Sequence, residues 1–263
     1  MSSRSRRSAA PSSGVHLLSS HRVITALVTA ADLGPTDLVI DFGAGPGTLT
    51  APLARTGARV LAVERDPRFV AALRRRFDDH PRVRVIHDDA RTVRLPRRPF
   101  AVVANIPFAV TTPLLRRLLT PAASGFSRAE LVVEWGLAKR LTAAGPRDAE
   151  SAWWSCRFEL AMRRRIPARC FTPAPGVDAA HLGVRRRSEV DHRVSAILWA
   201  LLSAAHQRAG TPARTSLQGV TPRRITQRLL GDRTAREITT ETWLTMAKTL
   251  AADRNVVTPR LPS

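Results

Sequence analysis

Four short segments of this 263-residue chain each follow an apolar run and carry residue types suited to binding or catalysis. In chain order they are Asp41-Phe42-Gly43-Ala44-Gly45-Pro46-Gly47, Glu64 in LAVERD, Asp89 in VIHDDA, and Asn105-Ile106-Pro107-Phe108. In an open parallel sheet, ligands bind beyond the carboxyl ends of the strands. If the apolar runs are neighbouring strands, we expect the four segments to line one site.

The first three segments predict a nucleotide-type cofactor site. Gly43 and Gly45 allow a sharp turn and a close approach of the backbone to a ligand. Glu64, about twenty residues further on, can accept hydrogen bonds from ribose hydroxyls, and Asp89 can bind an adenine amino group. Two cofactors satisfy this pattern, a dinucleotide and S-adenosylmethionine. The spacing of the glycines departs from G-x-G-x-x-G, which counts against a dinucleotide. The neighbours Arg65 and Ala90 are included in the predicted cofactor site.

The fourth segment, Asn105-Ile106-Pro107-Phe108, is suited to activating an exocyclic amine of a base. Such a nitrogen is a poor nucleophile because its lone pair is delocalised into the ring. The side-chain oxygen of Asn105 and the backbone carbonyl of Ile106 can each accept one N–H, which favours tetrahedral geometry at that nitrogen. Pro107 has no N–H and restricts the turn, while Phe108 offers a face on which an extruded base can stack.

The charge of the chain predicts a polyanionic partner. Lys and Arg total 42 against 21 acids, a net charge of +21, and the only lysines are Lys139 and Lys248. The preference for Arg over Lys is typical of GC-rich coding, but that bias does not account for the shortage of acids. Nucleic acid is the usual partner of so basic a chain, and its binding should weaken steeply with salt.

Several other functional classes are not favoured by the composition. Cys156 and Cys170 show no pairing or metal-ligand spacing, and neither do the histidines, so we expect no metal. No long uncharged apolar stretch or secretory signal is present, and 44% of the residues are hydrophobic, enough for a sizeable core. We therefore expect a cytoplasmic monomer without membrane contact.

The pattern along the chain predicts an α/β domain followed by a small all-helical domain. Residues 1–13 read as a disordered basic arm, 14–187 as the cofactor-binding α/β domain, and 188–263 as a small basic helical domain. Strands are expected at 38–42, 59–63, 83–87, 100–104, 131–134, 159–166 and 179–184. Helices are expected at 20–31, 48–54, 67–77, 194–205, 222–230 and 242–251.

In combination, these motifs resemble the ribosomal RNA adenine-N6 methyltransferases, and within them the macrolide-resistance (Erm) branch that acts on 23S rRNA. The resemblance spans Gly14 to Arg187 and rests on DFGAGPGTLT, VERD, HDDA and NIPF. The segment LVVEWGLAKRL, Leu131 to Leu141, is similar to the VEYGFAKRL-type segment of that branch, whereas the small-subunit enzymes usually have a Gln-Lys-Glu version. The family implies a class I, Rossmann-like methyltransferase fold with S-adenosylmethionine as cofactor. By this resemblance 14–187 would be the catalytic domain and 188–263 a helical domain that helps dock RNA.

The resemblance also implies roles for residues at the two ends of the catalytic domain. CFTPAPGV, starting at Cys170, matches the family's F-x-P-x-P-x-V loop and assigns Phe171 as a second stacking wall for the target base. The family's GQHFL-type segment reads GVHLL here, so Val15 and Leu17 replace a glutamine and an aromatic residue. Backbone groups of His16 and Leu18 are expected to contact the methionine end of the cofactor, next to Asn105.

The basic residues expected to contact RNA are Arg97, Arg116, Arg117, Arg140, Arg163 and Arg164. The run Arg163–Arg165 is open to two interpretations, contact with phosphates or the exposed edge of a strand. The run Arg74–Arg76 is interpreted as a solvated helix face, and Trp153-Trp154 as packing in the core or between domains.

The resulting hypothesis is methyl transfer from S-adenosylmethionine to N6 of one adenine in 23S rRNA. By resemblance, that adenine lies in the peptidyl-transferase and exit-tunnel region, and its methylation blocks macrolide binding. Two alternatives remain at this point: a 16S rRNA dimethyladenosine transferase, and a non-catalytic rRNA-binding factor that retains the fold.

Overall fold

The computed structural model describes residues 15–208, 210–253, 256–259 and 261. The predicted basic arm, 1–13, lies outside the described residues. The strands are β1 (Leu17–Leu18), β2 (Leu38–Phe42), β3 (Arg59–Glu64), β4 (Val83–His87), β5 (Phe100–Asn105), β6 (Phe126–Glu134), β7 (Phe158–Ile166), β8 (Phe171–Thr172) and β9 (Ala179–Arg186).

The helices alternate with the strands in the first part of the chain and then succeed one another. They are α1 (His21–Ala31), α2 (Thr50–Ala54), α3 (Pro67–Phe77), α4 (Phe108–Leu119), α5 (Trp135–Leu141), α6 (Ala149–Arg157), α7 (His192–His206), α8 (Ala213–Ser216), α9 (Arg223–Leu230) and α10 (Thr240–Ala252), with single 3-10 turns at Ala168–Cys170 and Ala235–Glu237.

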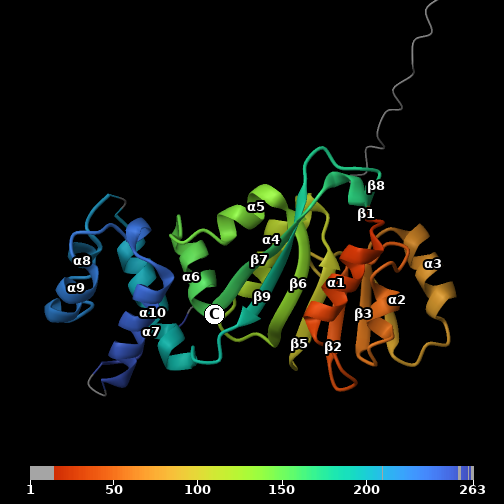
Figure 1. Ribbon diagram of the computed structural model, residues 1–263. Coiled ribbons are helices and arrows are strands. Elements are labelled where there is room, and N and C mark those ends of the chain that lie inside the picture. Colours follow the sequence, from red (N-terminus) through yellow and green to blue (C-terminus); the bar gives the residue numbers. More distant parts are fainter. Residues whose placement is uncertain (1–14, 209, 254–255, 260, 262–263) are drawn as a thin grey trace, which may run out of the picture.

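Seven strands form one sheet in the order β4-β3-β2-β5-β6-β9-β7 (Figure 1). The strands from β4 to β6 are parallel, and β9 runs antiparallel to both of its neighbours, so the sheet is mixed at that end. The chain leaves β2 toward β3 and β4 on one side, and returns to β5 and β6 on the other. The carboxyl ends of β2 and β5 therefore flank the topological switch point, where ligands of such sheets bind.

The two faces of the sheet are covered by different helices, which explains why the strands are apolar on both sides. Leu38, Ile40 and Phe42 of β2 pack in the cluster that contains α4 and α6, whereas Val39 packs with α1 and α2. Successive residues of a strand point to opposite faces, so a strand with a helix layer on each side has no polar face.

A buried guanidinium secures the far end of α4, the helix that begins at Phe108. Arg157, 2% exposed, donates to the carbonyls of Leu119, Thr120, Pro121 and Ala122 at 2.8–3.3 Å. The last carbonyls of a helix have no partner within the helix, and a cation there also matches the negative end of the helix dipole. Burial lowers the pKa of Arg157 to about 10, so its charge persists at neutral pH.

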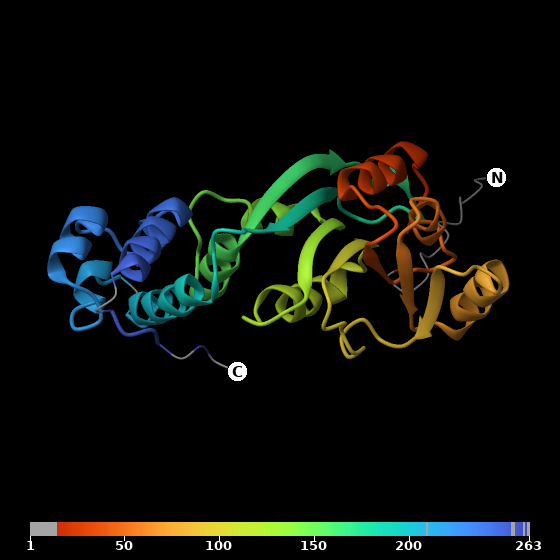
Figure 2. The same ribbon diagram turned by 90° about the horizontal axis from the view of Figure 1, so that it is seen from below.

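The elements after β9 are helices, and they lie beyond one edge of the sheet (Figures 1 and 2). α7 and α10 pack against α6, and Trp153 of α6 meets Trp199 of α7 edge to face, with ring centroids 5.3 Å apart. Both Trp153 and Trp154 are buried and donate from Nε1 to Thr120. The packing interpretation of the tryptophan pair is thus correct.

Candidate functional site

The glycine-rich turn after β2 lies against two other predicted site segments. Gly43 and Gly45 have φ of +70° and +54°, in the left-handed region where a side chain is strained. A Cβ on Gly43 would lie 3.4 Å from Pro107 Cδ, and one on Gly45 would lie 3.3 Å from Leu17 Cδ2. The fold therefore brings together the glycine turn, the NIPF segment and the N-terminal segment.

Glu64, at the carboxyl end of β3, is buried and organises the glycine turn. Its Oε2 accepts from the Gly45 N–H at 2.9 Å, and its Oε1 accepts from the N–H groups of Arg65 and Asp66 at 2.8 Å. A carboxylate has about four acceptor positions, so about one remains for a ligand. In this arrangement Glu64 can accept one ribose hydroxyl, rather than the two that we expected.

Asp89, after β4, is held by an arginine two residues further on. Arg91 donates to Asp89 Oδ1 from its N–H and Nε and to Oδ2 from Nη2, at 2.7–3.0 Å, and Arg65 Nη1 lies 3.9 Å from Oδ2. The hydrogen bonds from Arg91 lower the pKa of Asp89 to about 2, so it is ionised at neutral pH. The side chain of Arg91 is exposed, and that of Asp89 is 23% exposed.

Asp41 is a member of this group to which we assigned no role from the sequence. Its carboxyl group is buried at the end of β2, accepts from Thr50 Oγ1 at 2.7 Å, and lies near Glu64. Burial, together with the charge of Glu64, raises the pKa of Asp41 to about 7. The carboxyl group of Asp41 is therefore protonated below about pH 7 in the folded protein.

These features fit S-adenosylmethionine. The two glycines leave a cradle that side chains would fill, Glu64 retains an acceptor position for the ribose, and Asp89 is an ionised acceptor for the adenine. Arg65 and Ala90 lie next to these acids on the same loops, as predicted.

Asn105 ends β5 beside Val132 of β6, and a neighbouring carbonyl orients its amide. Nδ2 donates to the His16 carbonyl at 2.8 Å. Because that carbonyl can only accept, the NH2 group must face it, and the Oδ1 atom points to the other side. Asn105 thus presents an oriented acceptor. The His16 carbonyl, expected to contact the cofactor, is used to hold Asn105.

The rest of the NIPF segment connects the sheet to α4. Ile106 is 1% exposed, and its N–H donates to the Val132 carbonyl at 3.3 Å. Pro107 precedes the helix, and Phe108 is half-buried as its first residue. The rings of Phe108 and His16 lie 6.3 Å apart between centroids, tilted by 38°.

A two-residue strand pair, not predicted from the sequence, closes this side of the site. β1 pairs antiparallel with β8, so Leu17 lies opposite Thr172 and Leu18 opposite Phe171. His16 Nδ1 lies 2.9 Å from the Pro173 carbonyl. Two-residue strands have no periodicity to detect, and these two are about 150 residues apart in the chain.

Phe171 does not have the position expected of a stacking wall. It is 4% exposed and packs in the core cluster with Leu18 and Ile166. The F-x-P-x-P-x-V motif identified the loop, but the pairing of β8 with β1 turns this ring into the core. Of the two rings predicted to stack on the target base, Phe108 is half-buried and Phe171 is buried.

Three arginines predicted to contact RNA have protein partners instead. Arg163 forms a bidentate pair with the buried Glu130, at 2.7 and 2.8 Å, and Arg116 pairs with Glu150. Arg117 is partly buried and donates to the carbonyls of Ala90 and Val93. These side chains hold elements together, which a count of basic residues cannot reveal.

The remaining three differ in their position relative to the site. Arg97 precedes β5, with its carbonyl near Gly125 just before β6, so it lies at the opposite edge of the sheet from Asn105. Arg140 on α5 and Arg164 near the end of β7 lie toward the same edge as Asn105. Both are exposed, and neither has a side-chain partner among the described residues. β7 is an edge strand, as one interpretation of this arginine run proposed.

Arg74, Arg75 and Arg76 are exposed, in line with the interpretation of this run as a solvated helix face, but Arg76 also contacts the glycine turn. Its Nη1 donates to the carbonyl of Pro46 at 3.0 Å, and a Cβ on Gly47 would lie 3.0 Å from both Leu73 and Phe77. The α3 helix therefore packs against the glycine turn, which the linear sequence places about 30 residues away.

The described part of the chain contains no group of three or more His, Cys, Asp or Glu side chains placed to hold a metal ion. None of its helices has the length and hydropathy needed to cross a membrane.

Comparison with known proteins places this site in a family. The family model for ribosomal RNA adenine dimethylase matches residues 6–252. An rRNA adenine N-6-methyltransferase of Bacillus licheniformis is 32% identical over 246 residues, 90% of this chain and 86% of the relative. The ribosomal RNA small subunit methyltransferase A of Thermosynechococcus vestitus is 34% identical over 258 residues, 90% and 95% of the two chains.

A solved structure supports the same assignment. The crystal structure of the 23S rRNA methyltransferase ErmE matches with a TM-score of 0.77 and 26% identity, covering 88% of this chain and 98% of that one. The chain belongs to the ribosomal RNA adenine dimethylase family and is an S-adenosylmethionine-dependent rRNA adenine-N6 methyltransferase.

Proposed function

We propose that this enzyme methylates N6 of one adenine in the peptidyl-transferase and exit-tunnel region of 23S rRNA, in the cytoplasm, and so confers macrolide resistance. The observation that carries the proposal is the segment Glu134-Trp135-Gly136 at the junction of β6 and α5. This segment resembles the Erm branch, and β6 is the strand next to Asn105.

The chain's own residues would act mainly by positioning the target amine. Asn105 Oδ1, oriented by the bond from Nδ2 to the His16 carbonyl, accepts one N–H of the adenine amino group. The Ile106 carbonyl accepts the other. Two oriented acceptors favour tetrahedral geometry at this nitrogen and free its lone pair for attack, and they need no reorganisation during the reaction.

The cofactor supplies an electrophilic methyl group on a sulfonium. Glu64 would hold the ribose through its remaining acceptor position, and Asp89 the adenine, with the glycine turn beneath. Because the methyl group is already activated, the residues at the target nitrogen need only orient it and accept hydrogen bonds from its N–H groups. The proton that the amine loses on methylation would pass to solvent.

Phe108 would stack on the extruded adenine. It is half-buried at the start of α4, directly after the two acceptor positions. Stacking on an aromatic face contributes about 1–3 kcal/mol per base. Arg140 and Arg164, exposed at the same edge of the sheet, would contact the flanking phosphates.

A second candidate substrate is an adenine of 16S rRNA. The specific observation in its favour is the 34% identity to a small subunit methyltransferase over 90% of this chain. The two substrates require the same chemistry at N6, so the fold and the NIPF segment are compatible with both.

The deciding experiment is methyl transfer from labelled S-adenosylmethionine to protein-free 23S and 16S rRNA, with the modified nucleotide mapped by mass spectrometry. We expect label on a single 23S adenine, and raised macrolide tolerance in cells that express the enzyme. The mass also gives the number of methyl groups, which matters because Val15 and Leu17 depart from the family's motif. Label on 16S alone would reject the proposal in favour of the second substrate.

A further inference from the structure

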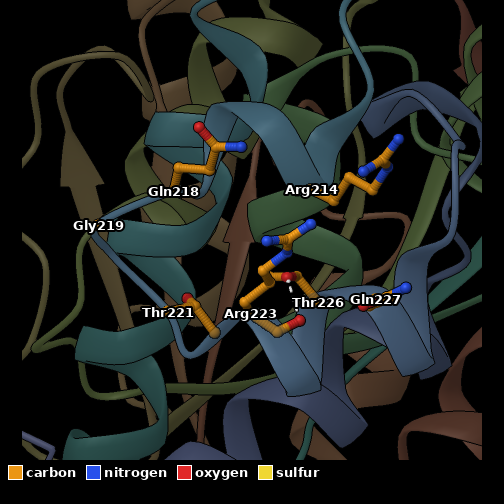
Figure 3. Close-up of a pocket in the computed structure, with 7 residues that line it drawn as sticks. All are labelled: Arg214, Gln218, Gly219, Thr221, Arg223, Thr226 and Gln227. Atoms are coloured by element: carbon orange, nitrogen blue, oxygen red, sulfur yellow. Dashed lines mark hydrogen bonds between the residues drawn. The ribbon is translucent and has the colours of Figure 1, made fainter.

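A polar hollow of about 380 Å³ lies in the C-terminal helices, apart from the methylation site (Figure 3). It is lined by Arg214, Gln218, Gly219, Thr221, Arg223, Thr226 and Gln227. These residues come from α8, from α9 and from the turn between them. Figure 1 places this helix pair at the opposite end of the molecule from α1, α2 and α3.

Arg223 and Gln227 are four residues apart on α9, a separation that places side chains on one face of a helix. Arg214 of α8 and Gln218, in the turn after that helix, add a second guanidinium group and a second amide to the lining. The result is two guanidinium groups and two amides around one space, with no carboxylate or aromatic ring among the lining residues.

The charges of the two guanidinium groups are not equally compensated. Arg214 pairs with Asp232, with Nη2 to Oδ1 at 2.6 Å. Arg223 is exposed and forms no side-chain hydrogen bond or ion pair with any residue that the structure describes. It also stands at the first position of α9, where the N–H groups and the helix dipole favour an anion.

A buried hydroxyl provides an independent indication that the hollow holds a ligand. Thr221 is only 8% exposed and lines the hollow, yet its Oγ1 has no hydrogen-bond partner within the described part of the chain. The nearby Thr226, by contrast, donates to the Arg223 carbonyl at 2.9 Å. Buried polar atoms are nearly always paired, so an unpaired one beside a cationic hollow indicates a missing partner.

We propose that this hollow binds a backbone phosphate of the RNA substrate, with Arg223 and the Thr221 hydroxyl as its principal contacts. A phosphodiester oxygen matches both groups, because a guanidinium and a hydroxyl donate to it. The absence of an aromatic ring from the lining argues against recognition of a base by stacking. Since phosphate contacts carry no sequence information, the hollow anchors the RNA and leaves selection of the adenine to the site at the sheet. This inference rests on the proposed function in one respect, that the RNA bound at the hollow is the rRNA substrate.

The test compares two neighbouring arginines of α9. Arg223→Ala removes a charge that lines the hollow, and Arg224→Ala removes an equal charge from an exposed position outside it. Affinity is measured by fluorescence anisotropy on a 23S rRNA fragment and on an RNA hairpin of unrelated sequence. We expect Arg223→Ala to weaken both by about 10-fold at about 0.1 M salt and to reduce the salt slope by about 0.7–0.9. Arg224→Ala should change both by less than about threefold.

A second pair of variants tests the hydroxyl. Thr221→Val should weaken RNA binding while leaving the melting temperature unchanged or higher, because it removes an unsatisfied buried group. Thr221→Ser retains the hydroxyl and should bind RNA like the wild type. Affinity for S-adenosylmethionine should be unchanged in all four variants.

The outcomes separate this inference from the proposed function. Equal effects of Arg223→Ala and Arg224→Ala, or RNA affinity unaffected by Thr221→Val, would overturn the phosphate site. Methylation mapped to 16S rRNA together with the expected loss in Arg223→Ala would reject the 23S assignment and support the site. Failure of the wild-type chain to bind either RNA would overturn the phosphate site.

Discussion

The two halves of the sheet's carboxyl edge differ in charge and in how their side chains are held. On the side of β2, β3 and β4, the site consists of carboxyl groups, Asp41, Glu64 and Asp89, each with a hydrogen-bond partner within the chain. On the side of β5, β6 and β7 the corresponding groups are the amide of Asn105 and the exposed cations Arg140 and Arg164.

In the proposed function the two sides would serve different ligands. On the side of β2, β3 and β4, which we call the acidic half, Glu64 and Asp89 would hold the ribose and adenine of the cofactor. On the side of β5, β6 and β7, which we call the basic half, Arg140 and Arg164 would contact RNA, a polyanion. Both ligands would meet at Asn105.

The largest expected effect is the loss of turnover when the amide of Asn105, where the two halves meet, is removed. Asn105→Ala removes the oriented acceptor, and we expect kcat to fall by at least about 100-fold, the loss seen when one oriented group is removed from a transition state. Binding of S-adenosylmethionine, measured by calorimetry, should change by less than about threefold. Turnover close to that of the wild type would contradict the mechanism.

Glu64→Gln tests the acidic half alone. It replaces an acceptor oxygen with an NH2 group facing the loop N–H groups of Gly45 or of Arg65 and Asp66. We expect the Kd for S-adenosylmethionine to rise about 10- to 100-fold, as for loss of a charged hydrogen bond, with RNA affinity unchanged. Glu150→Gln, at an exposed carboxylate paired with Arg116, is the matched control and should change neither.

Asp41 predicts a pH dependence of stability. Its pKa is raised by burial to about 7, so the folded state retains a proton that the unfolded state releases near pH 4. The stability this gives is full below pH 4 and is lost as the pH rises through 7. As the pH rises from 5 to 6, the free energy of unfolding of the wild type should fall by up to about 1.4 kcal/mol relative to that of Asp41→Asn.

Urea unfolding at a series of pH values measures this difference. Asp89→Asn is a control in which stability should change with pH in the opposite direction. Arg91 lowers the pKa of Asp89, so the stability that ionised Asp89 contributes is lost as the pH falls toward 2. Parallel pH profiles for the wild type and Asp41→Asn would show that Asp41 is ionised in the folded state.

The smallest effect is expected on the basic half. Arg140→Ala should raise KM for rRNA by about threefold and make the dependence of log affinity on log salt shallower by less than about one unit, with kcat unchanged. Arg74→Ala, an equal loss of charge on the exposed face of α3, is the matched control. Equal effects of the two would mean that only net charge matters.

Most of the fold and of the cofactor half of the site could be predicted from local patterns. Buried parallel strands read as continuous apolar runs, and their carboxyl ends meet at one edge, so Glu64, Asp89 and Asn105 could be placed together before any coordinates. The target half was predicted less well, because its members depend on contacts between distant segments. Arg97 was expected at the mouth but precedes its strand, and Phe171 was expected to face the base but is buried.

The amino-acid sequence alone determined the order of strands and turns, because side-chain periodicity and glycine act over a few residues. Only the tertiary structure decided which charges are available. Arg163 is bound to Glu130 across two strands, Arg117 binds the carbonyls of a loop, and the carboxyl group of Asp41 is protonated up to about pH 7. The partner and the burial of a charged group set its chemistry, and both are properties of segments that meet in space.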